Sequence, residues 1–311
     1  DSLSCNWAMS NIGTSAVIKD MIRYRVNSRD GTTYVFGAAG SIYAVSGNPL
    51  DPTVTAVYND ENGEIKGAGE WKQSDGNTYL YWATNTSIAR AIINGQPDTP
   101  WPAGFATQDY KTTLDAADYH PIRIAAGNLS IGNGNFLATI AYDGSFDPAA
   151  TNLRPGNVIR CLEERDDYVL MGSERTDESE EGHIWSWITT AENWVQKKKI
   201  PVKGINNLID TEVLLMQGGN QGEIFYSDFS NTAPLNSLPD GAGRSNSDGT
   251  AIWNDLALFG MYGTNNTTQT GIYSFGRRAQ NRPLVFNHEF RLTRTEAGST
   301  ISEIGAVWVA S

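Results

Sequence analysis

One short pattern recurs along this chain at intervals of 40 to 49 residues, and that period constrains the fold more than any other feature. Residues 212–228 are its cleanest copy. There the apolar run 213–216 leads into a Gly- and Asn-rich turn at 218–222, and a second β-prone run follows at 224–226. Each run is too short for a helix, and Gly and Asn tolerate the positive φ of a tight connection. The copy therefore predicts a β-hairpin.

Six copies can be aligned on the apolar residue that opens the second strand of this hairpin. Ahead of each hairpin lie a turn and a further apolar run, which in the better copies has a spacing of three, as in Ile159 with Leu162 and Ile205 with Leu208. Weaker outer runs, such as 54–58, follow most copies, so each unit predicts a four-stranded antiparallel meander. The six aligned residues are Ile42, Ile88, Leu137, Ile184, Ile224 and Ile272.

A fixed period in the forties, with four short strands per unit and no helical segment, is typical of a β-propeller. One meander cannot bury both of its faces, so neighbouring units must stack around an axis. We predict an all-β propeller at 18–311, with six complete repeats of about 46 residues and a partial seventh. Residues 1–17 are expected to pack on a blade or complete one.

The seventh unit begins at Ile301 and stops at Ser311. A propeller blade that lacks strands leaves an open sheet edge. Either residues 1–17 supply the missing strands or the natural protein continues beyond Ser311, and we expect the continuation.

Residues 94–119 are the longest departure from the repeat. Three prolines and two glycines among residues 94–105 exclude regular structure there. The aromatic residues Trp101, Phe105 and Tyr110 are candidates for contact with a partner, and packing between blades is the alternative for each.

Two polar connections join the same pair of strands in their units. Residues 174–182 hold five carboxylates, and residues 264–270 are rich in Asn and Thr. Equivalent connections of a propeller emerge on one face, so the two predict a recognition surface, although drift in loop length explains them equally well. The carboxylate spacing matches no calcium loop, and we predict no metal site. The candidate contact residues are Asp177, Glu178, Asn265 and Asn266.

Composition excludes some partners. The net charge of −12 argues against nucleic acid, which needs a concentrated basic surface. No apolar run is long enough to cross a bilayer, so we expect no membrane insertion.

Cys161 falls in a predicted innermost strand and is expected to be a buried free thiol, with a disulfide to Cys5 as the alternative. The triplet 197–199 is interpreted as a connection.

Linear motifs for catalysis are absent. The three histidines lie in three different units without metal-ligand spacing, and there is neither a phosphate-binding glycine loop nor a nucleophile elbow. We therefore assign no catalytic residue and no cofactor. Glycoside hydrolases on propellers use two acids from different blades, which no linear motif reveals, so that class stays open. Arg23, Arg123 and Arg160 lie in predicted inner strands, as sialidase arginines do, but not at equivalent positions.

Residues 158–162 with 170–172, residues 204–208 and residues 217–225 resemble repeats in poorly characterised propeller proteins of tailed-bacteriophage virions. The resemblance covers most of the chain from about residue 60 onward. It implies a tail- or baseplate-associated structural protein in the virion or outside the cell, whose partners are other virion proteins or a host-surface ligand. We expect a non-enzymatic scaffold or adsorption module. The alternatives are a secreted carbohydrate-active enzyme, either a glycoside hydrolase or a lyase, and a cellular protein-interaction propeller.

Overall fold

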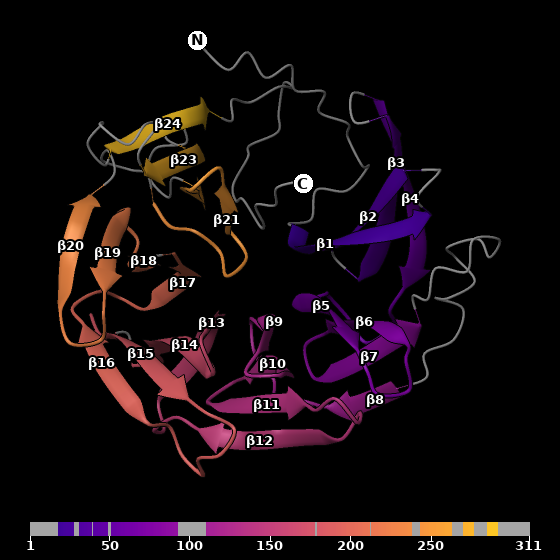
Figure 1. Ribbon diagram of the computed structural model, residues 1–311, viewed down its shortest axis with the longest axis horizontal. Helices are drawn as coiled ribbons and strands as arrows, with labels where there is room; N and C mark the ends of the chain where they lie inside the picture. The colour runs from indigo at the N-terminus through magenta and orange to yellow at the C-terminus, as the bar shows by residue number, and fades with distance from the viewer. Residues whose placement is uncertain are drawn as a thin grey trace.

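The computed structural model shows six four-stranded antiparallel sheets arranged radially around an axis, in agreement with the predicted propeller (Figure 1). Within the described residues there is no helix, and hence none that could cross a membrane. In every sheet the strands follow the order of the chain, with the first strand nearest the axis and the fourth at the outside. The described residues are 18–27, 31–38, 40–48, 51–92, 110–177, 179–211, 213–237, 243–262, 270–276 and 285–291.

Each sheet is one blade, and the blades are numbered in chain order. Blades 1 to 3 consist of β1 Ile18–Asn27, β2 Gly31–Ala38, β3 Ser41–Asn48, β4 Asp51–Asn59, β5 Gly67–Lys72, β6 Thr78–Ala83, β7 Ser87–Ile92, β8 Tyr110–Thr113, β9 Ile122–Ala125, β10 Asn128–Asn133, β11 Phe136–Ile140 and β12 Phe146–Asn152. Blades 4 to 6 consist of β13 Asn157–Arg165, β14 Tyr168–Arg175, β15 Gly182–Trp187, β16 Gln196–Ile200, β17 Ile205–Asp210, β18 Leu214–Gly218, β19 Glu223–Ser227, β20 Thr232–Ser237, β21 Thr250–Trp253, β22 Leu256–Met261, β23 Gly271–Gly276 and β24 Val285–Arg291. All six aligned apolar residues of the repeat lie in the third strand of their blade.

The spacing of three in the innermost strands has a structural cause. The register of β13 against β14 shifts between Ile159 and Cys161, and β17 has the same irregularity between Ile205 and Asn207. A β-bulge adds one residue, so positions i and i+3 then point to the same face of the sheet. Ile159 and Leu162 accordingly belong to one buried cluster of apolar side chains.

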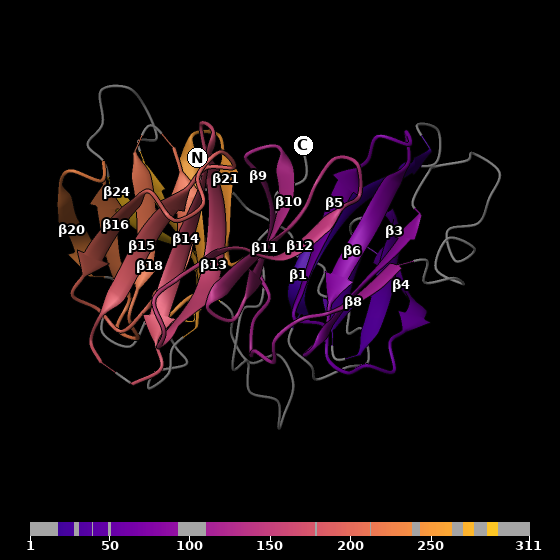
Figure 2. The ribbon, with the colours of Figure 1, turned by 90° about the horizontal axis from the view of Figure 1, so that it is seen from below.

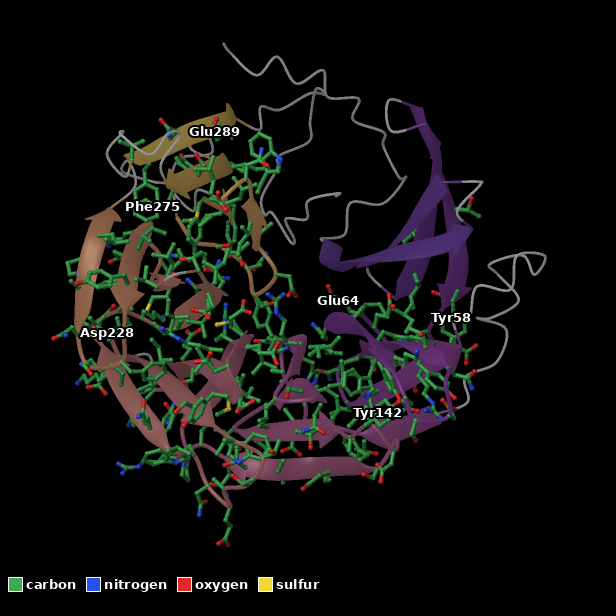
Figure 3. All side chains as sticks on the ribbon, in the orientation of Figure 1. Tyr58, Glu64, Tyr142, Asp228, Phe275 and Glu289 are labelled. Atoms are coloured by element: carbon green, nitrogen blue, oxygen red, sulfur yellow. The ribbon has the colours of Figure 1, made fainter. Side chains whose placement is uncertain are left out.

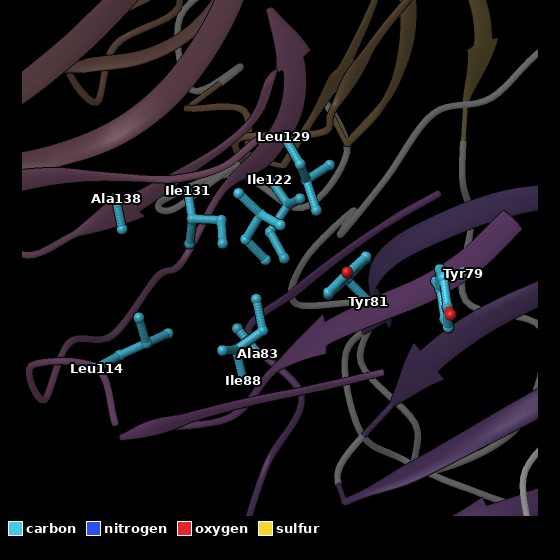
Figure 4. Close-up of a cluster of buried hydrophobic side chains, with 10 residues drawn as sticks. Tyr79, Tyr81, Ala83, Ile88, Leu114, Ile122, Leu129, Ile131 and Ala138 are labelled. Carbon is cyan, nitrogen blue, oxygen red and sulfur yellow. The ribbon is translucent and has the colours of Figure 1, made fainter. Parts of the chain in front are cut away.

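Neighbouring blades bury their apolar faces against each other. Between blades 2 and 3, Tyr81 and Ile88 pack with Ile122, Leu129 and Ile131 (Figure 4). All five side chains are at most 4% exposed. Similar buried clusters lie between blades 1 and 2, 3 and 4, 4 and 5, and 5 and 6, where the side chains drawn in Figure 3 fill the space between the sheets. Burial of this kind stabilises each blade only because a neighbour is present.

The meander order divides the connections between two faces of the ring, since the strands run between one face and the other (Figure 2). The inner-turn face carries the connections from first to second and from third to fourth strands. The blade-link face carries the connections from second to third strands and the links between blades. This division decides which residues can act together on one surface.

Two expectations about local structure were wrong. Residues 110–113, placed in the irregular segment, form β8, the fourth strand of blade 2. Residues 197–199, interpreted as a connection, lie inside β16, the outer edge strand of blade 4. In both cases antiparallel pairing with the third strand decides the structure. Lysines suit an exposed edge because they discourage pairing with another chain.

Of the remaining expectations about local structure, one concerns a described residue, and the others fall outside the described residues. Cys161 is a free thiol with no exposed surface, as predicted, and burial raises its pKa well above the ordinary value. Cys5, residues 1–17 and the seventh unit from Ile301 to Ser311 lie outside the described residues.

Close packing between blades 4 and 5 predicts the effect of Gly172→Ala. A Cβ at Gly172 would meet Sγ of Cys161, and it would lie 2.8 Å from Cγ2 of Ile205 in the next blade. We expect a loss of about 1–3 kcal/mol in the free energy of unfolding, measured by urea denaturation. In a Cys161→Ala background the sulfur is gone, so the same substitution should cost less. Equal costs in the two backgrounds would contradict this account of the packing.

Candidate functional site

Charged side chains from blades 3 and 4 meet at the axis of the ring. Nη2 of Arg123 in β9 lies 2.8 Å from Oε2 of Glu163 in β13, and the Glu163 side chain is only 10% exposed. A second pair, Arg165 with Asp210, joins blades 4 and 5 with a 3.8 Å separation between Nε and Oδ1. These pairs link the innermost strands of adjacent blades.

A third blade contributes an acid to the same cluster. Asp248 lies in the link that precedes β21, and Figure 1 shows this link reaching toward the axis. The charges of Arg123 and Glu163 both act on Asp248. Arg123 belongs to blade 3 and Asp248 to the link between blades 5 and 6, so this interaction joins separate parts of the ring. We call Arg123, Glu163 and Asp248 the axial cluster.

The environment of the axial cluster favours protonated carboxyls. Burial raises the pKa of Asp248 to about 6, although Arg123 opposes the shift. Burial also raises the pKa of Glu163, again against the effect of Arg123. An acid that changes protonation just below neutral pH, beside a second acid and an arginine, can exchange a proton with a ligand or bind its hydroxyl groups.

Two of the arginines noted in the inner strands have separate partners. Arg123 binds Glu163 at the axis, whereas Nη1 of Arg160 lies 2.9 Å from Oε2 of Glu174. The Arg160 guanidinium also lies 4.1 Å from the centre of the Tyr119 ring. The structure describes the backbone of the third, Arg23, in β1. Arg123 and Arg160 therefore do not converge as a sialidase cluster would.

In the acidic connection of blade 4, the carboxylate of Asp177 forms its hydrogen bonds with residues of the same connection. Asp177 accepts hydrogen bonds from Nε of Arg175 at 3.0 Å and from the backbone N–H of Ser179 at 3.2 Å. These bonds hold the pKa of Asp177 well below its usual range. Its carboxylate stabilises a local turn. The described residues contain no group of three or more potential ligands that could hold a metal ion.

The other candidate contact residues of the sequence fall on two faces or outside the described chain. Tyr110 opens β8 at the inner-turn face, while Asp177 lies on the blade-link face between β14 and β15. These two candidates are therefore not brought together. The candidates outside the described residues are Trp101, Phe105, Glu178, Asn265 and Asn266.

Apolar side chains gather on the inner-turn face. All seven large apolar residues that stand exposed in the described chain lie within two residues of a connection on this face, with exposures between 36% and 55%. One of them, Tyr142, lies at the outer hairpin of blade 3, and its carbonyl accepts a hydrogen bond from Ser74 of blade 2 (Figure 3). The seven are Ile124, Tyr142, Tyr168, Val195, Val213, Ile252 and Val285.

Acidic residues surround these apolar side chains. Hydrogen bonds from Tyr79 and Asn77 lower the pKa of Asp75, and bonds from Ser145 lower that of Asp143. Both carboxyls are therefore ionised at neutral pH. Further exposed acids at turns of this face are Asp166, Asp167, Asp228 and Asp255. The inner-turn face thus combines apolar contact area with negative charge.

His120 and His288 have packing roles. His120 is fully buried, and its two ring nitrogens lie 2.7 Å from the carbonyl oxygen of Gly132 and 3.0 Å from that of Asn85. Since Asn85 is in blade 2 and Gly132 in blade 3, His120 helps to join these blades. His288 stacks on Tyr273 with ring centres 4.3 Å apart.

Comparison with known proteins identifies the fold alone. No family model and no curated protein matches the chain. The β-propeller domain of Cps50 (Swd1) from Myceliophteria thermophila is similar at 11% identity and a TM-score of 0.55, covering 88% of each chain. U3-55K is similar at 14% identity and a TM-score of 0.54, and the likeness covers 85% of this chain and 78% of the U3-55K chain. BBS1N, solved in complex with ARL6DN, is similar at 12% identity and a TM-score of 0.52. The likeness covers 78% of this chain and 73% of BBS1N. These likenesses agree with the propeller architecture.

The raised pKa of Asp248 predicts a pH-dependent stability. Well below pH 4 the acid is protonated in both the folded and the unfolded state, and well above pH 6 it is ionised in both, so the cost of burying its charge grows as the pH rises between these values and is complete above them. Asp248→Asn should therefore add about 1–2 kcal/mol to the free energy of unfolding at about pH 7.5 and almost nothing at about pH 3, measured by urea denaturation.

Asp143→Asn is the matched control. The pKa of Asp143 is lowered, so its loss should destabilise the fold at about pH 7.5, and this effect should shrink as the pH falls below the ordinary pKa of an aspartate. If Asp248→Asn behaved in the same way, the assigned environment of Asp248 would be incorrect.

Proposed function

We propose that this propeller is a non-enzymatic interaction scaffold that docks a partner protein on its inner-turn face. The observation that carries the proposal is the gathering of all seven exposed large apolar residues on that face. Burying one such side chain in an interface is worth about 1.5–3 kcal/mol, so a few of them suffice for a specific contact. The surrounding acids favour a partner whose own surface is apolar with basic residues around it.

The rigid ring supports this role. Ion pairs at the axis and apolar packing between blades fix the strands from which the turns emerge. A binding surface that is already ordered loses little conformational entropy on association. Short turns on a packed scaffold therefore suit recognition better than long mobile loops would.

A virion structural or adsorption protein of a tailed bacteriophage is the specific role we propose, with the chain acting in the virion or outside the cell. Its support is the likeness of the repeat phrases at 158–162, 204–208 and 217–225 to virion propellers. The similar propeller BBS1N was solved in a complex with another protein, so a cellular interaction propeller is the alternative for the same face. Detection of this chain in purified particles by mass spectrometry distinguishes the two.

A carbohydrate-active enzyme is a second candidate because the axial cluster places two acids beside an arginine. If it is correct, the protein should release reducing ends from a glycan panel, and Glu163→Gln should reduce that release by about two orders of magnitude or more. Asp143→Asn, on a turn away from the axis, should leave it unchanged. No release from any glycan would exclude hydrolysis of those substrates.

Replacement of apolar residues on the inner-turn face tests the scaffold. Tyr142→Ser with Val195→Ser should lower the amount of this chain in purified particles at least roughly tenfold, because both side chains lose apolar contact area. Quantitative mass spectrometry measures the incorporated chain. Glu180→Ala with Gln221→Ala, both exposed on the blade-link face, is the control and should not change incorporation.

Thermal unfolding of both double variants must stay close to that of the parent protein for this comparison to hold. Equal incorporation of the two folded variants would contradict docking through the inner-turn face. Absence of the parent chain from particles would instead reject the virion role and leave the face to be tested against cellular partners.

A further inference from the structure

The outer part of the space between blades 3 and 4 holds two tryptophans and two cations. The rings of Trp185 in β15 and Trp194 lie edge to face, with centres 5.0 Å apart. Nζ of Lys197 lies 4.6 Å from the centre of the Trp185 ring, and the guanidinium carbon of Arg154 lies 5.8 Å from that of Trp194. Each cation thus contacts an aromatic ring, which stabilises its charge.

These two cations lack the acidic partners that their neighbours have. Arg175 binds Asp177, and Lys199 binds Glu181. In the part of the chain that the structure describes, no carboxylate pairs with Lys197 or Arg154. Burial lowers the pKa of Lys197, and the positive charges of Arg154 and Arg175 lower it further. Positive charge is therefore concentrated here on a protein whose net charge is −12.

A buried histidine beside the tryptophans has an unsatisfied ring nitrogen. His183 is 2% exposed, and its Nδ1 has no hydrogen-bond partner among the described residues. Its ring centre lies 5.6 Å from that of Trp185, and Lys197, Lys199, Arg175 and Glu181 all act on its charge. A buried polar atom without a partner is costly, so a ligand that binds it gains stability.

We propose that Arg154, His183 and Lys197, supported by Trp185 and Trp194, form a binding site for a tetrahedral oxyanion such as phosphate or sulfate. Oxygen atoms of the anion accept hydrogen bonds from the ammonium, the guanidinium and an imidazole N–H. Two unpaired positive charges and an N–H donor match the several oxygen atoms of a phosphate or sulfate group better than a single carboxylate. The anion is either free in solution or an ester group of a larger ligand. The proposal does not rest on the docking of a partner at the inner-turn face.

Histidine NMR tests the site directly. Burial and the charge of Lys197 lower the pKa of His183 to about 4, and a bound anion should raise it by stabilising the imidazolium. The ring resonances of His183 are followed through a pH titration with and without inorganic phosphate, at constant ionic strength. The ring resonances of His120 and His288 are internal references, and phosphate should not move them. An unchanged titration of His183 in saturating phosphate, sulfate and galactose 6-sulfate would overturn the proposal.

Neighbouring lysines provide a matched pair of variants. Lys197→Gln should weaken phosphate binding roughly tenfold or more by calorimetry, since a charged hydrogen-bond donor is lost. Lys198→Gln removes the same charge one residue away, but Nζ of Lys198 donates to the carbonyl of Ser230 in blade 5, so affinity should stay within about twofold. Equal weakening by both variants would show non-specific attraction and reject the site.

Two further measurements complete the test. If Lys197→Gln does not fold, Arg154→Gln replaces it, because Arg154 is exposed in the link between blades 3 and 4. Comparison of galactose 6-sulfate with inorganic sulfate distinguishes the two sources of the anion. Tighter binding of the sugar sulfate indicates an ester on a saccharide, and equal or weaker binding indicates the free anion.

Discussion

Face-to-face burial between neighbouring blades is the interaction on which the rest of this structure depends. A single four-stranded meander presents apolar side chains on both faces, and only a blade on each side removes them from water. Cys161, Ile184 and Ile205 show the result, since these three side chains from blades 4 and 5 lie in one cluster and have no exposed surface. The radial arrangement also forces the innermost strands together, which is why charged side chains of three blades meet at the axis.

The sequence could predict this architecture because each blade repeats its own local pattern. Bulges at Ile159 and Ile205 even left a readable trace, the spacing of three that keeps two apolar residues on one face. β8 was missed because Tyr-Lys-Thr-Thr contains no apolar run, and its pairing partner β7 ends eighteen residues before Tyr110, at Ile92. Pairing between distant segments is a tertiary effect that a local pattern does not contain.

The candidate sites were harder to predict for the same reason. Arg123, Glu163 and Asp248 come from three blades, so no linear spacing could have identified their meeting at the axis. The carboxylates of the acidic connection were visible in the sequence, but Asp177 is occupied by Arg175 and Ser179 in its own turn. The exposed apolar face could have been found, because strand order alone determines which face each turn belongs to. What the sequence did not show was which apolar residues near those turns stay exposed.

Radial packing has one more consequence, at the outside of the ring. Sheets that converge at the axis diverge outward, so wide or long side chains must fill the outer space. On β16, alternation directs Lys197 and Lys199 to one face and Lys198 to the other. Lys198 reaches a carbonyl of blade 5 and Lys199 reaches Glu181, while Lys197 lies on Trp185 without a carboxylate partner among the described residues. Three consecutive lysines thus differ in what they can still bind.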